Sequence, residues 1–439
     1  MSLISKLTTL GAAGAGGDSY WIFQENVSPT TAHAIYDIDT DTQNNIVFSG
    51  YMNVGSDRRG WVAKIDTDGA LQWSKYLDGV SQSYTYGITT DSNDNVISTT
   101  MDFGNETFNT VSLDASGNEN WKRKNGVTNK EHPESIACDV SDNVYSYGWS
   151  ESWSNGRPDT LTLKHNSSGT LLFKLWSGDN TNSSIDLIKG FDIAEVPSTG
   201  YMAVCGQSDK RTTGSVYDAF IGRIAKSNGY PNFIRVLYHA SGNSRCMGVA
   251  ADSSGNIYGL IYQSSSGAYI AKYSSGGVFQ WLKKITVSGS NNFVPGKAIA
   301  VDSNDNIFVA WGFYPDSPVM KLDSSGNILA NIYISDGSYI NFAALEIDGN
   351  DNVVVTGYGD GVSDFLVIKL PNDLTSVIGS YGSFTISAGS ATSTTSSGLT
   401  STSQSFNSST SPNAGETFLD TTSTITTGNV SANETLTEM

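Results

Sequence analysis

Asp91-Ser-Asn-Asp-Asn95-Val-Ile is the stretch that decides the fold: a polar turn that leads directly into β-forming residues. Seven versions of this turn occur at intervals of about 50 residues, a spacing typical of repeat architectures. The other six begin at Asp39, Asp139, Glu195, Asp252, Asp302 and Asp348, and the copy at Glu195 is degenerate. We therefore expect seven structural units.

A second signature lies between successive copies of the first: a strand, a tight turn and another strand. One example is Val62-Ala-Lys-Ile-Asp-Thr-Asp-Gly69-Ala-Leu-Gln-Trp73. Asp, Asn, Ser and Gly dominate such turns because their short side chains satisfy nearby backbone groups and glycine accepts a positive φ. Each unit therefore contains two hairpins, or four strands, which we call a, b, c and d.

Four strands per unit, seven units and the lack of helical periodicity predict an all-β fold. The expected architecture is a seven-bladed β-propeller of four-stranded antiparallel blades over residues 18–380. An open sheet of this many strands would curl or split, whereas radial repetition leaves only short and protected edges.

The segment 19–25 is expected to close the ring as the outer strand of the last blade. Trp21 precedes Asp39 by the same interval that separates Trp73 from the turn aspartate of its following repeat. The segment therefore has the register of a d strand, although no a, b or c strand precedes it. In the competing interpretation, residues 374–378 form that outer strand.

Composition excludes several classes of function. The net charge is −18 with only 25 Lys and Arg residues, which argues against nucleic acid because phosphate binding requires a positive surface. No stretch is apolar enough to span a membrane. Cys138, Cys205 and Cys246 are expected in a and b strands as buried small hydrophobes, not as a disulfide framework.

The two ends differ in character from the repeats. Residues 1–17 comprise a short anchor and a Gly/Ala linker, and residues 381–439 form a Ser/Thr-rich arm with too few hydrophobes to fold alone. The arm is either disordered or ordered against a partner subunit or a symmetry mate, and we favour the second. The apolar residues expected to make assembly contacts are Leu3, Ile4, Leu7, Phe406, Phe418, Leu419 and Ile425.

The turns resemble the opening of a calcium loop, since Asp91, Asn93 and Asn95 have the right spacing for oxygen ligands. However, position six is Val96, which enters a strand, and no glutamate completes the cage. We therefore predict structural Asx-type turns, no metal and no cofactor. No catalytic constellation is evident, so we predict that the protein is not an enzyme, although a glycosidase-type carboxylate pair stays open.

Loop length points to one face of the ring. The b–c and d–a connections share a face and are longer than the a–b and c–d turns, and loops on a rigid scaffold commonly carry binding residues. The aromatic residues in or beside these loops are candidates for stacking on sugar rings: Trp149, Trp153, Trp311 and Tyr314. The alternative is that these rings cap the blades or pack beneath the loops.

The Asp-x-x-(Asp/Gly)-Asn-(Ile/Val) turn and a following Gly-aromatic step resemble the seven-bladed propeller repeat called SBBP over about residues 19–380. The step occurs at Gly50-Tyr51, Gly148-Trp149 and Gly357-Tyr358. The resemblance implies the fold, and such propellers serve many functions. The N-terminal segment and the Ser/Thr-rich C-terminus look like structural proteins of marine tailed bacteriophages, in which a short anchor precedes a propeller.

This resemblance implies a virion structural protein, in the tail, a fibre or a capsid decoration, which assembles in the host cytoplasm. Its expected partners are other virion proteins or symmetry mates, with host-surface glycans as a further candidate ligand. The alternative function is a secreted or cell-surface bacterial adhesin or binding module. A third is a carbohydrate-active enzyme.

Overall fold

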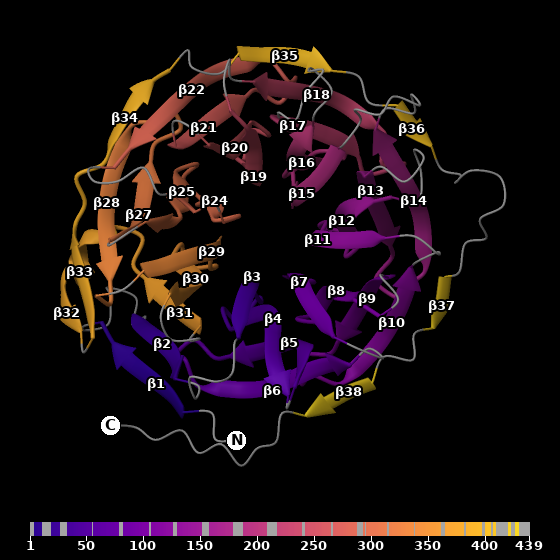
Figure 1. Ribbon diagram of the computed structural model, residues 1–439, viewed down its shortest axis with the longest axis horizontal. Helices are drawn as coiled ribbons and strands as arrows, with labels where there is room; N and C mark the ends of the chain where they lie inside the picture. Colours follow the sequence, from indigo (N-terminus) through magenta and orange to yellow (C-terminus); the bar gives the residue numbers. More distant parts are fainter. Residues whose placement is uncertain are drawn as a thin grey trace.

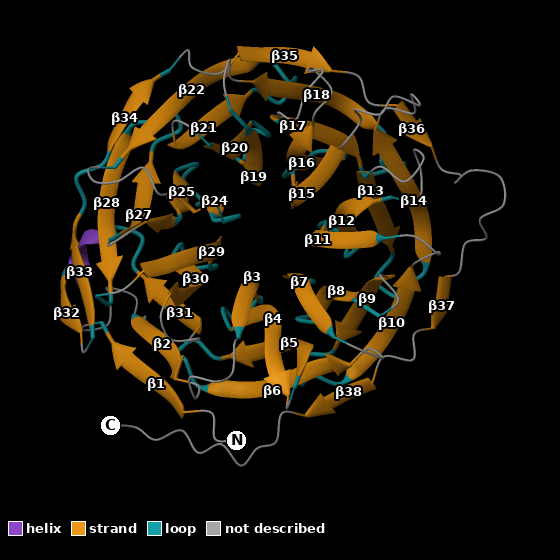
Figure 2. Ribbon diagram, in the orientation of Figure 1, coloured by secondary structure: helices purple, strands orange, loops and turns teal. Residues whose placement is uncertain are grey.

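The computed structural model is a ring of seven β-sheets around a central axis (Figure 1). It describes residues 4–10, 19–26, 33–54, 56–78, 82–104, 107–125, 130–151, 158–178, 188–208, 217–238, 242–264, 267–287, 293–294, 296–313, 316–337, 339–360, 365–381, 383–396, 400–404, 407–409, 420–422 and 426–429. Within these ranges the regular structure is strand, apart from one 3₁₀ turn at Thr375–Val377 (Figure 2). The predicted seven-bladed all-β propeller is confirmed.

Each blade contributes four antiparallel strands, ordered a to d from the axis outward. Blade 1 comprises β3 (Ala34–Thr40), β4 (Ile46–Val54), β5 (Asp57–Ile65) and β6 (Leu71–Asp78). Blade 2 comprises β7 (Ser83–Thr90), β8 (Val96–Asp102), β9 (Thr107–Leu113) and β10 (Glu119–Asn125). Blade 3 comprises β11 (Glu131–Cys138), β12 (Val144–Ser150), β13 (Asp159–His165) and β14 (Leu171–Gly178). Blade 4 comprises β15 (Ile188–Glu195), β16 (Tyr201–Ser208), β17 (Asp218–Ala225) and β18 (Pro231–Tyr238). Blade 5 comprises β19 (Ser244–Ala251), β20 (Ile257–Gln263), β21 (Gly267–Tyr273) and β22 (Phe279–Thr286).

The last two blades depart from the simple pattern. Blade 6 comprises β24 (Ile299–Val301), β25 (Ile307–Ala310), β27 (Ser317–Leu322) and β28 (Ile328–Ser335), and its inner hairpin continues as a separate pair, β23 (Phe293–Val294) with β26 (Gly312–Phe313). Blade 7 takes β29 (Tyr339–Ile347), β30 (Val353–Asp360) and β31 (Phe365–Leu370) from the end of the repeats and β2 (Trp21–Asn26) from the start of the chain.

Closure by the N-terminal strand is therefore confirmed. Strand β2 pairs antiparallel with β31, with Trp21 opposite Lys369. The competing segment 374–378 contains the 3₁₀ turn and is not the outer strand of blade 7. The aspartate of blade 1 that is equivalent to Asp91 is Asp41, not Asp39 as the spacing predicted, because Asp41 accepts the turn's hydrogen bonds.

A tryptophan of the d strand fastens each of four blades to the next. The indole N–H of Trp21 donates to the Thr67 carbonyl at 3.0 Å, and Trp73 donates in the same way to Ala115. Trp121 and Trp281 repeat the bond. The acceptor is in every case the second residue of the next blade's c–d turn, so β2 has the register of the other d strands.

The a–b turns of six blades are Asx-type turns, as predicted, and the degenerate turn of blade 4 is not. In blade 1, Asp41 Oδ1 accepts the backbone N–H groups of Gln43 and Asn45, and Oδ2 accepts the Asn45 side-chain amide. Lys64 of the c strand pairs with the same carboxylate at 2.6 Å. These protein donors occupy the oxygens that a calcium loop would offer to an ion.

The same turns link most neighbouring blades. In five blades the fourth turn residue has a positive φ and accepts a backbone N–H from the turn of the preceding blade, as Asp94 does from Thr42 at 2.9 Å. Between blades 3 and 4 the acceptor is Glu195, and in blade 5 the equivalent residue is Gly255, which has no side chain to accept the bond. Asn44 accepts the N–H of Gly349 at 2.7 Å, which joins blade 7 to blade 1. Asp and Asn suit this position because they tolerate a left-handed conformation and carry a short acceptor.

A fifth strand lies on the outer edge of every blade (Figure 1). Strand β1 (Ile4–Thr9) pairs with β2 of blade 7. The C-terminal arm then runs backwards around the ring from blade 6 to blade 1. We call the strands of this arm the belt: β33 (Phe384–Ala388) on β28, β34 (Thr392–Thr395) on β22, β35 (Thr400–Gln404) on β18, β36 (Asn407–Ser409) on β14, β37 (Asp420–Thr422) on β10 and β38 (Thr426–Asn429) on β6.

The belt corrects one expectation. Order in the arm was expected to come only from other chains, yet its described strands pair with the d strands of the same chain. The physical reason is that the outer edge of a blade presents unpaired N–H and C=O groups. Any extended segment can satisfy these groups, so pairing does not require the hydrophobic residues that the arm lacks.

Candidate functional site

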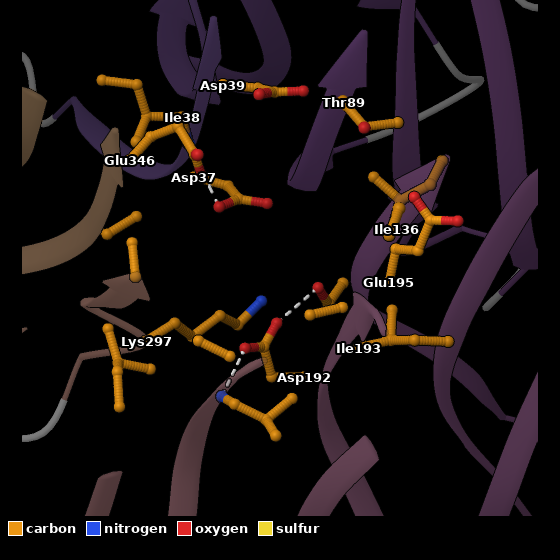
Figure 3. A pocket seen from close by; sticks show the side chains of 18 of the residues that line it. Asp37, Ile38, Asp39, Thr89, Ile136, Asp192, Ile193, Glu195, Lys297 and Glu346 are labelled. Carbon is orange, nitrogen blue, oxygen red and sulfur yellow. Dashed lines mark hydrogen bonds between the residues drawn. The ribbon is translucent and has the colours of Figure 1, made fainter. Parts of the chain in front are cut away.

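The a strands of all seven blades line a central cavity of about 400 Å³. Each blade places two kinds of residue there. The residues three positions before the turn aspartates, such as Ile38, Ile88 and Ile136, are buried between blades. The neighbouring positions carry polar or small side chains, among them Asp37, Asp39 and Thr89, Asp192, Glu195, Lys297 and Glu346 (Figure 3).

Irregularities in the a strands shape the mouth of this cavity on the long-loop face. In six blades the a–b register shifts across one residue that has no partner in the b strand, which is the mark of a β-bulge. In blade 6 the equivalent residue lies between β23 and β24. We call these seven partly exposed residues the bulge ring: Tyr36, Tyr86, Glu134, Phe191, Met247, Lys297 and Ala343.

The bulges explain the Gly-aromatic step of the b strands. A Cβ at Gly50 would lie 1.8 Å from the Ala34 carbonyl oxygen, and one at Gly148 would lie 2.0 Å from that of His132. No side chain fits there, because the bulged a strand pushes a carbonyl into the space. The aromatic residue that follows the glycine, Tyr51 or Trp149, lies beside the mouth.

Aromatic rings form a continuous arc along one side of the mouth, from blade 7 to blade 3. Tyr36 stacks on Tyr86 with centroids 5.2 Å apart and an interplanar angle of 10°. Tyr86 contacts His132 at 4.7 Å, and His132 stacks on Trp149 at 4.9 Å. We call the whole set the aromatic arc: Tyr36, Tyr51, Tyr84, Tyr86, His132, Trp149 and Tyr358.

Cations lie over the arc. The exposed Arg58 donates from Nη1 to the Tyr84 hydroxyl at 2.6 Å, and its guanidinium lies 5.2 Å from the Tyr51 ring centroid. Lys189 Nζ lies 3.8 Å from the centroid of Trp149. Burial raises the pKa of the Tyr36 and Tyr86 phenols, so both hydroxyls stay neutral and able to donate hydrogen bonds.

Below the mouth the cavity is acidic. Burial raises the pKa of Asp37 to about 7 and that of Asp39 to about 6. Burial also raises the pKa values of Asp192 and Glu346, and the neighbouring carboxylates Asp37 and Asp39 add to the rise for Glu346. Lys297 reaches across the mouth from blade 6 and donates to the Glu134 carbonyl of blade 3.

Three of these carboxylates bond to the next blade. Asp37 Oδ2 accepts the Ile88 N–H at 3.1 Å, and Asp39 Oδ2 accepts the Thr90 N–H at 2.6 Å. Asp192 accepts the N–H of Val249 at 2.9 Å (Figure 3). The a strand is the inner edge strand of each blade, and its outward backbone N–H groups have no partner strand. These carboxylates accept some of those N–H groups.

The structure separates the aromatic residues predicted to bind sugar. Trp149 belongs to the aromatic arc but is only 9% exposed; its indole N–H donates to Glu134. Trp311 is 1% exposed and belongs to a core cluster of blades 5 and 6, which favours the alternative that this ring packs beneath the loops; its ligand-binding role stays a prediction. Trp311 directly follows the buried strand Ile307–Ala310, and the apolar run of that strand continues into the core with it. Trp153 and Tyr314 lie outside the described residues.

Of the predicted assembly residues, only Ile4 and Leu7 lie within the described part of the chain. Both belong to β1, which pairs with the chain's own β2, and their role in assembly stays a prediction. The remaining five, Leu3, Phe406, Phe418, Leu419 and Ile425, lie outside the described residues. The bulge ring was missed, although six of its members lie five residues before a turn aspartate and Phe191 lies five residues before Val196 of the degenerate turn.

Across the part of the chain that the structure describes, no group of three or more His, Cys, Asp or Glu side chains is placed to hold a metal ion. The described residues also contain no helix with the length and apolar character needed to cross a membrane.

No family model matches the chain. A stretch of 125 residues, 26% of the chain, is 28% identical to a WD repeat-containing protein of Acanthamoeba polyphaga mimivirus, and that stretch spans 8% of the relative's length. Sqt1 from Chaetomium thermophilum is 10% identical with a TM-score of 0.43, covering 79% of this chain and 99% of that one. The β-propeller domain of the Trilobed protease from Pyrococcus furiosus is 9% identical with a TM-score of 0.46, covering 78% and 98%.

Proposed function

We propose that this protein is a non-enzymatic docking module whose bulge ring and aromatic arc receive a partner polypeptide. The observation that carries the proposal is the chemistry of the mouth: Tyr, Phe and Met side chains from neighbouring blades, with Arg58 exposed at the rim. Tyr, Trp, Phe, Met and Arg are the residues enriched at the centres of protein interfaces. The rigid ring holds them in place without a large entropic cost on binding.

A polypeptide suits this mouth better than a glycan. Sugar recognition by stacking needs an accessible ring face. His132 stacks on Trp149 with an interplanar angle of 5°, and Lys189 lies over the same ring. Tyr36 and Tyr86 likewise cover each other. The arc therefore presents ring edges, hydroxyl groups and the Arg58 guanidinium, which suit backbone carbonyls and side chains of an extended segment.

The non-catalytic assignment rests on how the cavity carboxylates are used. Asp37 and Asp39 each accept one backbone N–H from the next residue of their own strand and one from the a strand of blade 2. Asp192 accepts hydrogen bonds from the Ser135 hydroxyl at 2.7 Å and from the Val249 N–H. These bonds hold adjacent blades together. A glycosidase pair would instead require two carboxyl groups free to face a substrate.

The test compares binding to a random-peptide array and a glycan array. The labelled wild-type protein, a Tyr86→Ala variant and a Val140→Ser control are applied to both; Val140 is 81% exposed on the a–b turn face. We expect peptide binding by wild type and control and a loss of at least tenfold in Tyr86→Ala, with melting temperatures confirming that all three fold. Binding to glycans alone, or equal peptide binding by all three proteins, would contradict the proposal.

We further propose that the docking partner is another structural protein of a tailed-phage particle. The support is the resemblance of the two chain ends to marine phage structural proteins, together with the belt, since sealed blade edges suit a protein displayed on a particle. Immunogold labelling of particles purified from the phage host tests this placement. Label on the particles is expected, whereas label on the cell surface or in the medium would favour the alternative adhesin.

A further inference from the structure

The belt is attached unequally along its length. Its first strand, β33, is anchored by side chains: Phe384 is 2% exposed and Ile386 is 1% exposed, and both pack in a core cluster with Leu374 and Val377. The belt is therefore rooted in blade 6 of its own chain. This root fixes where the rest of the arm begins.

Beyond the root, backbone pairing dominates. In β34, Thr392, Thr394 and Thr395 are exposed, and four residues pair with β22 through their main chains. The side chains add only isolated bonds, such as Ser393 Oγ to the Gly326 carbonyl at 2.6 Å. A main-chain ladder carries little sequence information, so the β22 edge of any copy of this protein accepts the same strand.

The energetic balance of these strands is narrow. Ordering one residue costs about 1–2 kcal/mol in backbone entropy, and a hydrogen bond contributes a net of about 0.5–1.5 kcal/mol. Backbone pairing over three to five residues therefore gains little free energy over the detached arm. The core-anchored β33 does not share this balance.

Charge favours a second copy as the partner of a detached belt. No Lys or Arg follows Lys369, whereas the outer d strands carry several cations, including Lys122, Lys124 and Lys284. Lysines on an open edge repel other cationic strands and discourage unspecific pairing. A neutral to acidic Ser/Thr strand meets no such repulsion. The arm of another copy supplies such strands in the same order as the blades with which they pair.

We propose that the belt beyond Gly389 is exchangeable and that, where copies of this chain are crowded together, the belt of one copy pairs with the outer d strands of a neighbouring copy. The partner is a second copy of this chain, and the surface is the outer rim of the ring. This surface is separate from the mouth of the cavity, so the inference stands independently of the proposed docking function. Exchange dominates where neighbouring copies reach the effective concentration of the tethered arm, about millimolar.

A disulfide trap tests the exchange. Thr286 on β22 lies directly opposite Thr392 on β34, and both are exposed. Directly opposed residues have Cβ atoms about 4.5–5.5 Å apart, close to the range for a disulfide. The single variants Thr286→Cys and Thr392→Cys are mixed at high concentration and oxidised. The matched control is Thr286→Cys mixed with Val140→Cys, which lies on the a–b turn face.

We expect reduction-sensitive dimers in the mixture at tenfold or more above the Val140 control, and a yield that falls about tenfold on tenfold dilution. The double variant, with both cysteines in one chain, should cross-link within the monomer at low concentration. Exchange is overturned if the double variant cross-links internally at every concentration while the mixture stays at the control level. Failure of the double variant to cross-link internally would overturn the belt pairing on which the inference rests.

Discussion

Replacing Trp21 by alanine tests whether the N-terminal strand holds the ring closed. Trp21 is 1% exposed and packs in the core between blades 7 and 1, and its indole N–H bonds to Thr67 of blade 1. Truncating a buried tryptophan to alanine costs about 3–5 kcal/mol, and the lost hydrogen bond adds about 1 kcal/mol. With about 2.1 cal/mol/K of unfolding entropy per residue, this corresponds to a fall of about 5 °C in Tm.

The assays are thermal unfolding and hydrogen exchange of Trp21→Ala beside Trp73→Ala. Trp73 makes the equivalent bond to Ala115 but is partly exposed. Its strand, β6, follows β5 of the same blade directly in sequence, whereas β2 reaches blade 7 from the other end of the chain. We expect the larger Tm loss for Trp21→Ala and a selective loss of amide protection in β31, the partner of β2. Equal losses in the two variants, or full protection of β31 in Trp21→Ala, would refute the claim that this strand secures the ring.

Three further predictions follow from the turns, the bulges and the cavity. EDTA should leave Tm unchanged, because protein donors occupy the turn oxygens; a fall of many degrees would show bound calcium. Gly148→Ala should lower Tm by several degrees because its Cβ would meet the His132 carbonyl, whereas Gly200→Ala, with nothing within 4 Å, should stay near wild type in the same melting series. Folded Asp37 keeps its proton to about pH 7, whereas the carboxyl of the unfolded chain loses it near pH 3.8, so wild-type stability falls as the pH rises through this window. The Tm of Asp37→Asn should therefore rise relative to that of the wild type between pH 5 and pH 8. A Tm difference that stays constant with pH would contradict the raised pKa of Asp37.

The architecture could be predicted from the sequence because the turns consist of residues with specific backbone preferences. Asp and Asn at positions such as Asp94 adopt a positive φ and bridge blades, so their spacing directly reports the blade period. The closing strand was predicted correctly although its interval was counted to Asp39 and not to Asp41. The structure confirms it, since Trp21 makes the same inter-blade bond as the other d-strand tryptophans. The degenerate fourth turn still closes, with Val196 donating to the Tyr201 carbonyl in place of the aspartate-based turn.

The site was harder to predict because its geometry comes from backbone irregularities and not from a motif. A bulge residue such as Tyr86 has no sequence mark of its own, and only its offset from the turn aspartate identifies it. Trp311 was assigned to a loop surface because hydropathy does not distinguish a ring above the blade from one inside it. The belt was missed because its strands pair through their main chains, so the arm needs no hydrophobic pattern and its sequence has none.

Closure by β2 sets the order of events while the ribosome makes this chain. Trp21, Ile22 and Phe23 leave the exit tunnel before the blades, but their partner strand, Phe365–Leu370, emerges only after six blades have been translated. At about 5–20 residues per second, these three apolar residues wait roughly 20–70 s without the strand that buries them. A nascent chain of this protein therefore exposes an unpaired apolar strand while the blades are synthesised, and crowded polysomes or scarce chaperones should lower its yield before any defect in the finished ring becomes visible.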